Sequence, residues 1–303
     1  MGRSKSNLSG KQMKIKVIIG IICVVFFALF WFVIKPMMSP IYEVPNGTAE
    51  MHFIDVWQGD STLIMVGEQT VLIDTGEKDA KNALLNYLDE HSVTVIDYFI
   101  ITHYDSDHFA NAQTVLETYD VKTLITPDQT KSTNMYKNFF AVAKEQKSAK
   151  KIDWLLANDM IGQSIKIEEL EITIIAPLDD YGDDSNNHSI ATMIRYGNRR
   201  VFLTGDAEKE AEKDIVERYG IQELDCDVYK LGHHGSNSSS SQELLDKMTP
   251  DYVVISCGAN NDYGHPHEET VERVKDMVVY RTDKQGTIVL SIANDELSFK
   301  TEK

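Results

Sequence analysis

The sequence predicts an α/β protein in which two β-sheets are covered by helices in one domain, behind one apolar N-terminal helix. Two observations carry this prediction. Apolar runs with strand character alternate with segments of helical spacing through residues 49–303. An uncharged apolar run at residues 17–34 stands apart near the N-terminus. At 303 residues, the chain is long enough for one large domain of this kind.

The N-terminal segment predicts a membrane anchor. Residues 17–34 contain no charge, and eighteen apolar residues are enough to cross a bilayer as a helix. Residues 1–16 carry basic side chains and no acid, which keeps this end in the cytoplasm. We therefore expect a cytoplasmic N-terminus at 1–16, a single-pass transmembrane helix at 17–35, a tether at 36–48 and an extracytoplasmic domain at 49–303. A cleaved signal peptide is the alternative, but the apolar run is long and no small-residue cleavage site follows it.

The first half of the domain alternates between strands and helices. Strands are predicted where β-branched and aromatic residues gather, and the helix at 78–90 is predicted from Ala80, Leu84, Leu85 and Leu88, which share one face. The expected strands are 51–56, 61–66, 70–74, 98–102 and 121–125, and the expected helices are 78–90, a segment through Ala112 and Leu116, and 135–147.

The second half begins with a run of strands and then alternates again. The expected strands are 154–156, 164–167, 170–175, 189–195, 200–204, 228–231, 252–256, 278–281 and 287–292, with helices at 208–219 and 268–276. Cys226 and Cys257 lie in or beside strands, and we expect buried free thiols there, although one disulfide is the alternative.

Histidine and aspartate residues that could bind metal ions gather where the predicted strands end. His103-Tyr104-Asp105-Ser106-Asp107-His108 follows the strand at 98–102 and places four potential metal ligands within six residues. Imidazole and carboxylate together suit zinc, manganese or iron, and a site with several carboxylates can hold two cations. Asp206, the pair His233-His234 and His265 follow three further strands. Because buried unpaired ionisable groups are costly, convergence on metal ions explains all four strand ends.

These segments resemble a known family. The chain is similar to the metallo-β-lactamase-fold hydrolases, in particular the branch with the extracytoplasmic domain of the competence protein ComEC and the phosphorylcholine esterases. The resemblance runs in order from about residue 49 to 295. It rests on Phe53-Ile54-Asp55-Val56-Trp57-Gln58-Gly59-Asp60-Ser61, Leu72-Ile73-Asp74-Thr75-Gly76, the His103–His108 segment, Asn186-Asn187-His188-Ser189, Leu203-Thr204-Gly205-Asp206, His233-His234-Gly235-Ser236, Tyr263-Gly264-His265-Pro266 and Tyr280-Arg281-Thr282-Asp283.

The resemblance implies an αββα sandwich with two divalent metal ions at the rim between two mixed sheets. Carried over by position, His103 and Asp105 hold one metal, Asp107 and His108 hold the other, and Asp206 bridges them. Asp105 stands where the family more often has histidine, and this harder ligand tilts the site toward manganese or iron relative to zinc. His188 stands near where many relatives place a third histidine.

The remaining ligand and the supporting residues are also implied by the resemblance. One of His233 and His234 completes the metal site, while the other and His265 lie near the substrate. Asp74 and Asp60 are expected behind the ligands, where they orient a ligand histidine. Asn187 and Ser236 are expected to donate hydrogen bonds to a phosphate.

The implied reaction is hydrolysis of a phosphoester or phosphodiester. Two cations would lower the pKa of a bridging water to give a hydroxide, and Asp107 or Asp206 would take up the proton. Competence-like motifs suggest DNA as the substrate. Charge disfavours DNA: the chain is formally −17, and removing the six basic residues of 1–35 leaves −23 for the rest. A β-lactamase or lactonase acting on an acyl bond, and a non-catalytic binding module, are the alternatives.

Overall fold

The computed structural model describes residues 17, 20, 21, 24, 25, 27 and 42–303. Glu43–Lys303 form one compact unit. Most of the predicted transmembrane helix and of the tether lies outside the described residues, so the membrane prediction stays a prediction. Within the described part of the chain, no helix combines the length and apolarity needed to span a bilayer.

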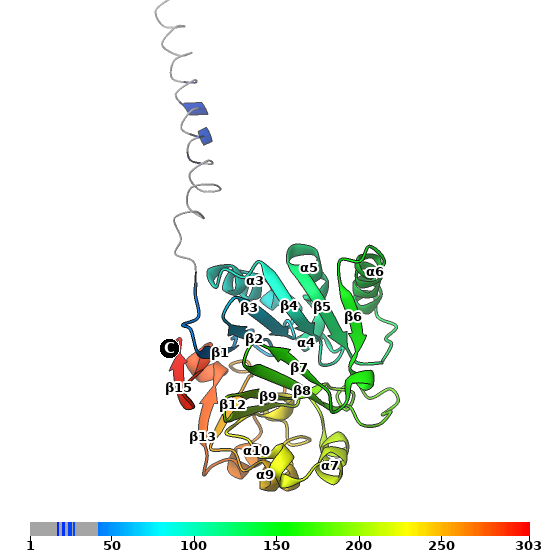
Figure 1. The fold of residues 1–303 in the computed structure, drawn as a ribbon, viewed down its shortest axis with the longest axis vertical. Coiled ribbons are helices and arrows are strands. Elements are labelled where there is room, and N and C mark those ends of the chain that lie inside the picture. Colours follow the sequence, from blue (N-terminus) through cyan, green and yellow to red (C-terminus); the bar gives the residue numbers. More distant parts are fainter. Residues whose placement is uncertain (1–16, 18–19, 22–23, 26, 28–41) are drawn as a thin grey trace, which may run out of the picture. The chain divides into compact units, whose positions relative to one another are not determined.

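Two mixed β-sheets make up the compact unit (Figure 1). Eight strands form the first sheet, in the order β15-β14-β1-β2-β3-β4-β5-β6, and seven form the second, in the order β13-β12-β11-β10-β9-β8-β7. The strands are β1 (Thr48–Phe53), β2 (Thr62–Val66), β3 (Gln69–Ile73), β4 (Val95–Ile100), β5 (Asp120–Thr126), β6 (Asp153–Leu156), β7 (Ser164–Ile167), β8 (Leu170–Ala176), β9 (Ala191–Tyr196), β10 (Arg199–Leu203), β11 (Val228–Lys230), β12 (Tyr252–Ile255), β13 (Val278–Arg281), β14 (Ile288–Ala293) and β15 (Glu296–Thr301).

Each sheet has a parallel half and an antiparallel half. Strands β3 to β6 run parallel in the first sheet, and β10 to β13 run parallel in the second. The carboxyl ends of neighbouring parallel strands lie at the same edge of a sheet. Asp74 follows β3, His103 follows β4, Asp206 follows β10 and His233 follows β11, so the chain delivers its polar side chains from strand ends in both sheets.

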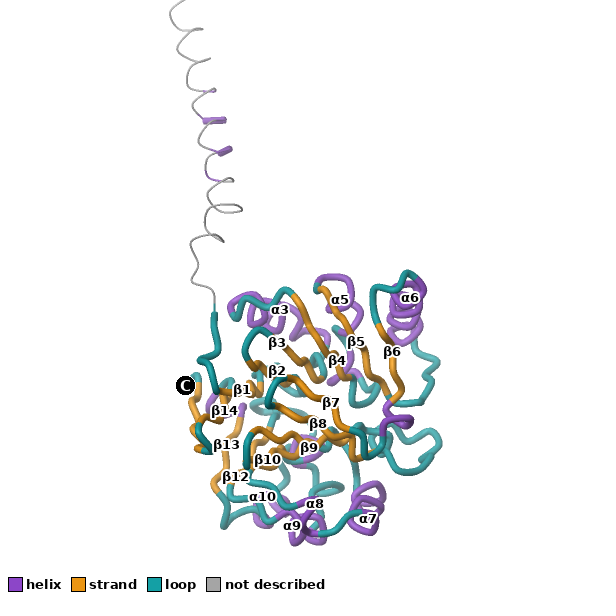
Figure 2. Tube along the Cα trace, viewed as in Figure 1, coloured by secondary structure: helices purple, strands orange, loops and turns teal. Residues whose placement is uncertain are grey.

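Helices cover the outer faces of the sheets (Figures 1 and 2). Those over the first sheet come from the first half of the domain: α3 (Lys81–Glu90), α5 (Ala112–Thr118) and α6 (Asn134–Ser148). The short helix α4 (Ser106–Phe109) lies apart from them, at the ends of the strands. Those over the second sheet come from the second half: α7 (Lys209–Arg218), α8 (Ile221–Leu224), α9 (Gln242–Met248) and α10 (Glu268–Arg273), with α11 (Thr282–Gln285) after β13. Short 3-10 turns lie at Lys78–Ala80, Ala157–Met160 and Gly232–Gly235.

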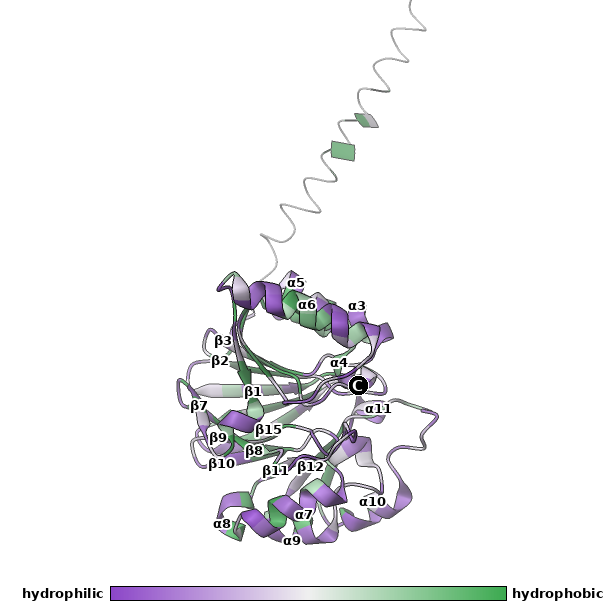
Figure 3. Ribbon diagram, turned by 90° about the vertical axis from the view of Figure 1, so that its right-hand side faces the viewer, coloured by the Kyte–Doolittle hydropathy of each residue, from purple (hydrophilic) through white to green (hydrophobic). Residues whose placement is uncertain are grey.

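The apolar core has a layer between the sheets and layers under the helices (Figure 3). Met51, Ile64 and Ile100 of the first sheet meet Ile172 and Val201 of the second in the inter-sheet layer. The outer face of the second sheet packs on α7, α8 and α9 through a separate cluster. Burial on both faces explains why the central strands are apolar almost throughout instead of alternating.

The two-sheet prediction is confirmed, but one strand, β15, and four short helices, α4, α8, α9 and α11, were missed. The chain was expected to end with the strand at 287–292, but Glu296–Thr301 pair with it as β15. This strand alternates between exposed and half-buried residues and lacks an apolar run, so only its pairing reveals it. Helix α9 was missed because it is short and follows a serine-rich loop. Cys226 and Cys257 are buried free thiols, as expected.

Phe99 tests the core under the helices of the first sheet. It is fully buried near the carboxyl end of β4, so Phe99→Ala leaves a cavity between two packed layers. We expect the free energy of unfolding to fall by about 3–5 kcal/mol, measured by urea denaturation. Phe140→Ala, at an exposed position of α6, is the matched control and should lose much less. A loss below about 1 kcal/mol for Phe99→Ala would contradict this packing.

Candidate metal centre

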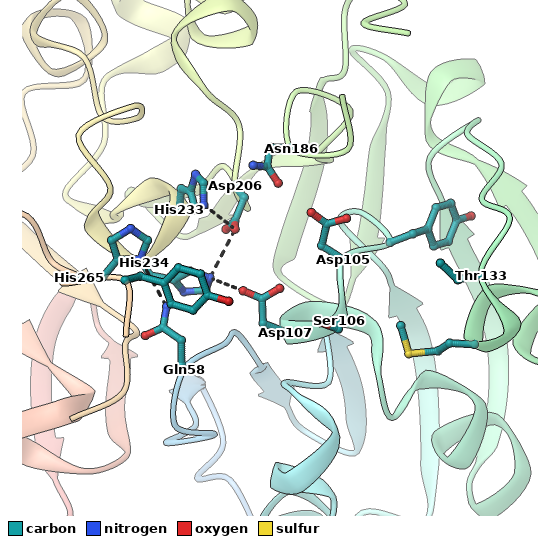
Figure 4. Close-up of a pocket in the computed structure, with 13 residues that line it drawn as sticks. Gln58, Asp105, Ser106, Asp107, Thr133, Asn186, Asp206, His233, His234 and His265 are labelled. Atoms are coloured by element: carbon teal, nitrogen blue, oxygen red, sulfur yellow. Dashed lines mark hydrogen bonds and ion pairs between the residues drawn. The ribbon is translucent and has the colours of Figure 1, made fainter. Parts of the chain in front are cut away.

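Four side chains lie close together across the edge where the two sheets meet, and Figure 4 shows three of them, Asp107, Asp206 and His234. Asp206 is buried and lies with Oδ1 3.0 Å from His108 Nε2 and with Oδ2 3.3 Å from His234 Nε2. His234 Nε2 also lies 3.2 Å from Asp107 Oδ2. The two imidazole nitrogens are 3.3 Å apart. Two nitrogens and two carboxylates therefore surround one small volume, which is the ligand type of a divalent metal site.

The backs of both imidazoles are held by hydrogen-bond acceptors. His108 Nδ1 donates to Asp74 Oδ2 at 2.7 Å, and His234 Nδ1 donates to the Ser256 carbonyl at 3.0 Å. Asp74 is itself fixed, because Thr102 donates to it from its backbone nitrogen and its hydroxyl at 2.8 and 2.6 Å. An acceptor at Nδ1 leaves the lone pair on Nε2, which is the tautomer that binds a metal. Asp74 therefore lies behind His108, on the Nδ1 side of its ring.

Asp60 lies behind this group. Asp60, His108, Asp206 and His234 are all buried and offer potential ligand atoms within 4.8 Å of one another. However, Asp60 faces the Nδ1 side of the histidines, at 4.0 Å from His108 and 3.8 Å from His234. Those nitrogens already donate to Asp74 and Ser256, so Asp60 cannot share a metal with the Nε2 atoms. Its carboxylate pairs instead with the buried ammonium of Lys230.

Backbone conformation sets the direction of the second-sheet ligands. Gly205 has φ +55°, and a Cβ there would lie 3.0 Å from Thr102 and 3.1 Å from Ser189. Only glycine fits this close turn between β10 and Asp206. His233 and His234 both adopt left-handed backbone, with φ of 49° and 54°. Two successive non-glycine residues in this region are strained, a feature that functional sites often keep.

A second group of possible ligands lies on the other side of Asp206. Its Oδ2 is 3.7 Å from His233 Nε2 and 4.0 Å from His103 Nε2. His233 Nδ1 is 3.2 Å from Glu208 Oε1, so a carboxylate again holds the back of a histidine. His103 Nε2 is buried and has no hydrogen-bond partner among the described residues. Asp105 lines the same pocket. The distances from Asp206 to these histidines are longer than those to His108 and His234.

Burial and charge shift the pKa values around Asp206. Burial disfavours the charged form of His234, but the carboxylates of Asp206 and Asp107 outweigh it and raise its pKa to about 10. Burial also favours the neutral form of His108, but the carboxylates of Asp206 and Asp74 outweigh it and hold the pKa of His108 well above its usual range. Burial would raise the pKa of Asp206, but His108 and His234 hold that pKa well below its usual range. In the metal-free protein the histidine charges therefore offset the carboxylate charges.

These residues fit a divalent metal. The tautomers direct Nε2 of three histidines at Asp206, and the orphaned Nε2 of His103 faces the same carboxylate. The neighbouring histidines hold the pKa values of Asp206 and Asp107 low, so both carboxylates are ionised. A cation at Asp206 would replace the protons that His108 and His234 carry in its absence. His108, His234, Asp206 and Asp107 would hold one ion, and Asp206, His103, His233 and Asp105 are the residues that would hold a second.

The ligand side chains open onto a cavity of about 370 Å³. Several of its walls come from residues that sequence reasoning did not single out, such as Thr133 and Met135 at the start of α6. No local signal marks these two as pocket residues. The lining is Gln58, Tyr104, Asp105, Ser106, Asp107, Thr133, Met135, Asn186, Asp206, His233, His234, Tyr263 and His265. This lining, all of it described, includes no lysine or arginine.

Three predicted site residues need correction. His188 is buried away from the cluster, with Nε2 3.2 Å from the Gly182 carbonyl and 3.6 Å from Asp180. Asn187 holds the loop before α7, since its side chain accepts from Glu208 N and donates to Asp184. Ser236 is buried against Ser238. None of the three lines the pocket, and Asn186 stands where Asn187 was expected.

Comparison with known proteins places this fold in a family. A model described as "Metallo-beta-lactamase superfamily" matches residues 54–259. The chain belongs to the metallo-beta-lactamase superfamily. Igni18, a metallo hydrolase from Ignicoccus hospitalis KIN4/I, shares the fold with a TM-score of 0.51 and 18% identity, over 80% of this chain and 98% of its own. The superfamily is one of metal-dependent hydrolases, and the buried ligand cluster agrees with that class.

Two curated relatives support the competence-protein branch of the superfamily. ComE operon protein 3 from Bacillus subtilis is 30% identical over 292 residues, covering 89% of this chain and 35% of the relative. Recombination protein 2 from Haemophilus influenzae is 29% identical over 288 residues, covering 93% of this chain and 32% of the relative. The chain thus spans about a third of the length of these relatives.

Metal binding should release protons at neutral pH. Because the pKa of His234 is raised to about 10, this histidine is protonated at pH 7 and must lose its proton to bind a metal. Zinc titrations in two buffers of different ionisation enthalpy should show proton release, and affinity should rise between pH 6 and 8. The His234→Ala variant should release fewer protons, whereas His188→Ala should behave as the unmodified protein. Titration without proton exchange would contradict the protonated state.

Proposed function

We propose that this chain is a membrane-anchored, extracytoplasmic metal-dependent phosphodiesterase that uses two divalent ions. The observation that carries the proposal is Asp206 between two sets of histidines, three of which have Nδ1 held by an acceptor. Bound divalent cations would supply Lewis acidity and an activated water. Zinc, manganese and iron all suit these ligands, and Asp105 favours the harder two.

The pocket composition supports an anionic substrate held by metals. Asp105, Asp107 and Asp206 line the cavity, and the lining has no basic side chain to offset them. Without cations, a phosphodiester would meet three carboxylates and be repelled. With two cations bound, the same pocket would offer positive charge only next to the reacting group. Two relatives are named as a recombination protein and a competence protein, and these names support a nucleic-acid phosphodiester over an acyl bond.

The chain's own residues would position the reaction and hold its protons. Asp107 is partly exposed to the cavity, and the hydrogen bond from His234 and the His108 charge outweigh burial and lower its pKa. It would therefore stay ionised and orient a water by accepting its hydrogen bond. Asp206, buried and fixed by two histidines, would hold the two ions at a set spacing. Asn186 lines the cavity and adds a side-chain amide for a phosphoryl oxygen.

A small or cell-wall-linked phosphodiester fits the acidic surface at least as well as DNA does. The chain is −17 overall, and residues beyond 35 carry −23, which repels a polyanion at a distance. The activity of the longer relatives therefore cannot be assigned directly to this chain. A lactonase or β-lactamase would use the same fold and metals on an acyl bond.

Activity can be tested with a small chromogenic phosphodiester. The full chain, purified in detergent and loaded with Mn²⁺ or Zn²⁺, should hydrolyse bis(p-nitrophenyl) phosphate. Asp206→Ala should lower kcat/KM by at least about 10³-fold, since it removes the residue shared by both ions. His188→Ala keeps the ligands and is the control. Nitrocefin, a homoserine lactone and single-stranded DNA are the competing substrates. Turnover that survives Asp206→Ala would overturn the two-metal proposal.

The anchor makes a separate prediction about location. Residues 17–34 are apolar and uncharged, with basic residues before them. We expect the full chain to stay in the membrane fraction after alkaline carbonate washing, and protease added outside spheroplasts should digest the domain. Deletion of residues 1–35 should release it from the pellet. Protection of the domain from external protease would contradict the predicted orientation.

A further inference from the structure

We propose that Gln58 holds His265 in the tautomer that carries its proton on Nε2, which makes His265 a hydrogen-bond donor to the substrate and excludes it from the metal ligands. The inference rests on the proposed function only for the identity of the group that receives this hydrogen bond. The tautomer itself follows from contacts within the protein.

The partners at Nδ1 separate the pocket histidines into two kinds. In His108, His233 and His234, Nδ1 faces an acceptor, namely Asp74, Glu208 and the Ser256 carbonyl. With the proton of each neutral ring on Nδ1, these three rings would offer the lone pair of Nε2 to a metal. In His265, Nδ1 faces the side-chain amide of Gln58 at 3.4 Å, which is marked in Figure 4. Whether this amide presents a hydrogen-bond donor or an acceptor to Nδ1 therefore decides the role of His265.

The amide of Gln58 is oriented by a backbone group that can only donate. Gly258 N–H donates to Gln58 Oε1 at 3.0 Å, so Nε2 of the amide must be the atom that faces His265. Nε2 of an amide is a donor, so His265 Nδ1 must accept and cannot carry a proton. The single proton of the neutral ring then sits on Nε2. An imidazolium is disfavoured as well, because its Nδ1–H would face another donor.

The close approach of these two loops leaves little freedom for the amide. A Cβ on Gly258 would lie 2.8 Å from Gln58 N and 3.2 Å from its Cβ, so glycine is needed for the contact. Asn261 fixes the backbone of His265 from the other side, since Oδ1 accepts from His265 N at 3.0 Å and Nδ2 donates to His265 O at 2.6 Å. Both partners of the Gln58–His265 contact are therefore held in place.

The ring of His265 lies next to the metal ligands and faces the cavity. The centroid of this ring is 6.1 Å from that of His234, and the two rings are stacked with 28° between their planes. Its centroid is 5.5 Å from that of His233. Tyr263 stacks on it at 5.6 Å, and both residues line the pocket. His265 Nε2 has no hydrogen-bond partner among the residues of 42–303. A donor in this position can reach a phosphoryl oxygen of a substrate bound at the metals.

The chemistry assigned to His265 is charge stabilisation without proton transfer. A neutral imidazole N–H is a good donor and a very weak acid, so the proton stays on Nε2 while negative charge builds on the phosphoryl oxygen. Removing one donor of this kind typically lowers kcat by about 10²–10³-fold. Gln58 does not touch the substrate and acts through His265 as a positioning residue.

Gln58→Glu tests the assignment because it changes the partner of Nδ1 from a donor to an acceptor at constant size. The full chain, labelled with ¹⁵N-histidine and loaded with Zn²⁺, is studied by NMR in detergent, with His265→Phe identifying the His265 signals. We expect the Nε2–H tautomer in the unmodified protein and the Nδ1–H tautomer in Gln58→Glu. Gln58→Met, which offers neither partner, is the matched control and should give a mixture.

The same variants separate donor loss from metal loss. With bis(p-nitrophenyl) phosphate, we expect His265→Phe and Gln58→Glu to lower kcat by about 10²–10³-fold with KM changed less, and zinc content to stay at the unmodified level. An Nδ1–H signal in the unmodified protein would overturn the proposal, as would loss of a zinc equivalent in His265→Phe. If the unmodified protein cleaves no phosphodiester, the proposed function fails, and the NMR result still decides the tautomer.

Discussion

Buried charge at the edge shared by the two sheets is the constraint on which the rest of the structure depends. Asp60, which follows β1, pairs with Lys230 at the end of β11, and both side chains are buried. Removing either partner would leave an uncompensated charge in the interior, which is strongly destabilising. The pair therefore fixes the first sheet to the second directly behind the metal ligands. The backbone of Asp60 also reaches the ligand loop, since its N–H donates to the Asp107 carbonyl.

Charge on the front of the same histidines is balanced in a similar way. Asp206 and Asp107 face His108 and His234, and the histidines carry raised pKa values in return. When no metal is bound, the protons on His108 and His234 thus balance the charge of the acidic cluster, and a bound cation would take the place of these protons. This explains how the buried groups Asp206, His108 and His234 can lie together with the partly exposed Asp107 without unfolding the sheets. The strained backbone at His233 and His234 belongs to the same arrangement, because both rings reach the pocket from consecutive residues.

The direction of each imidazole, and not merely its presence, divides the chemistry of the pocket. Rings with an acceptor at Nδ1 are suited to a metal, and the ring with a donor at Nδ1 is suited to the substrate. Five histidines within one site can therefore have different roles although their side chains are identical. The absence of lysine and arginine from the pocket lining, all of which the structure describes, leaves positive charge to the cations.

The layered fold and most of the candidate ligands could be predicted from the sequence. Strand and helix periodicities are local, and the ligands follow strand ends, so His103, Asp107, His108, Asp206 and His234 could be found from pattern and resemblance. The tertiary structure alone decided which ligand atoms meet. Asp74 reaches His108 from 34 residues away, Gln58 reaches His265 from 207 residues away, and His188 turns into its own loop. Local patterns do not encode such contacts, because they depend on how two sheets are stacked and not on the residues of one strand.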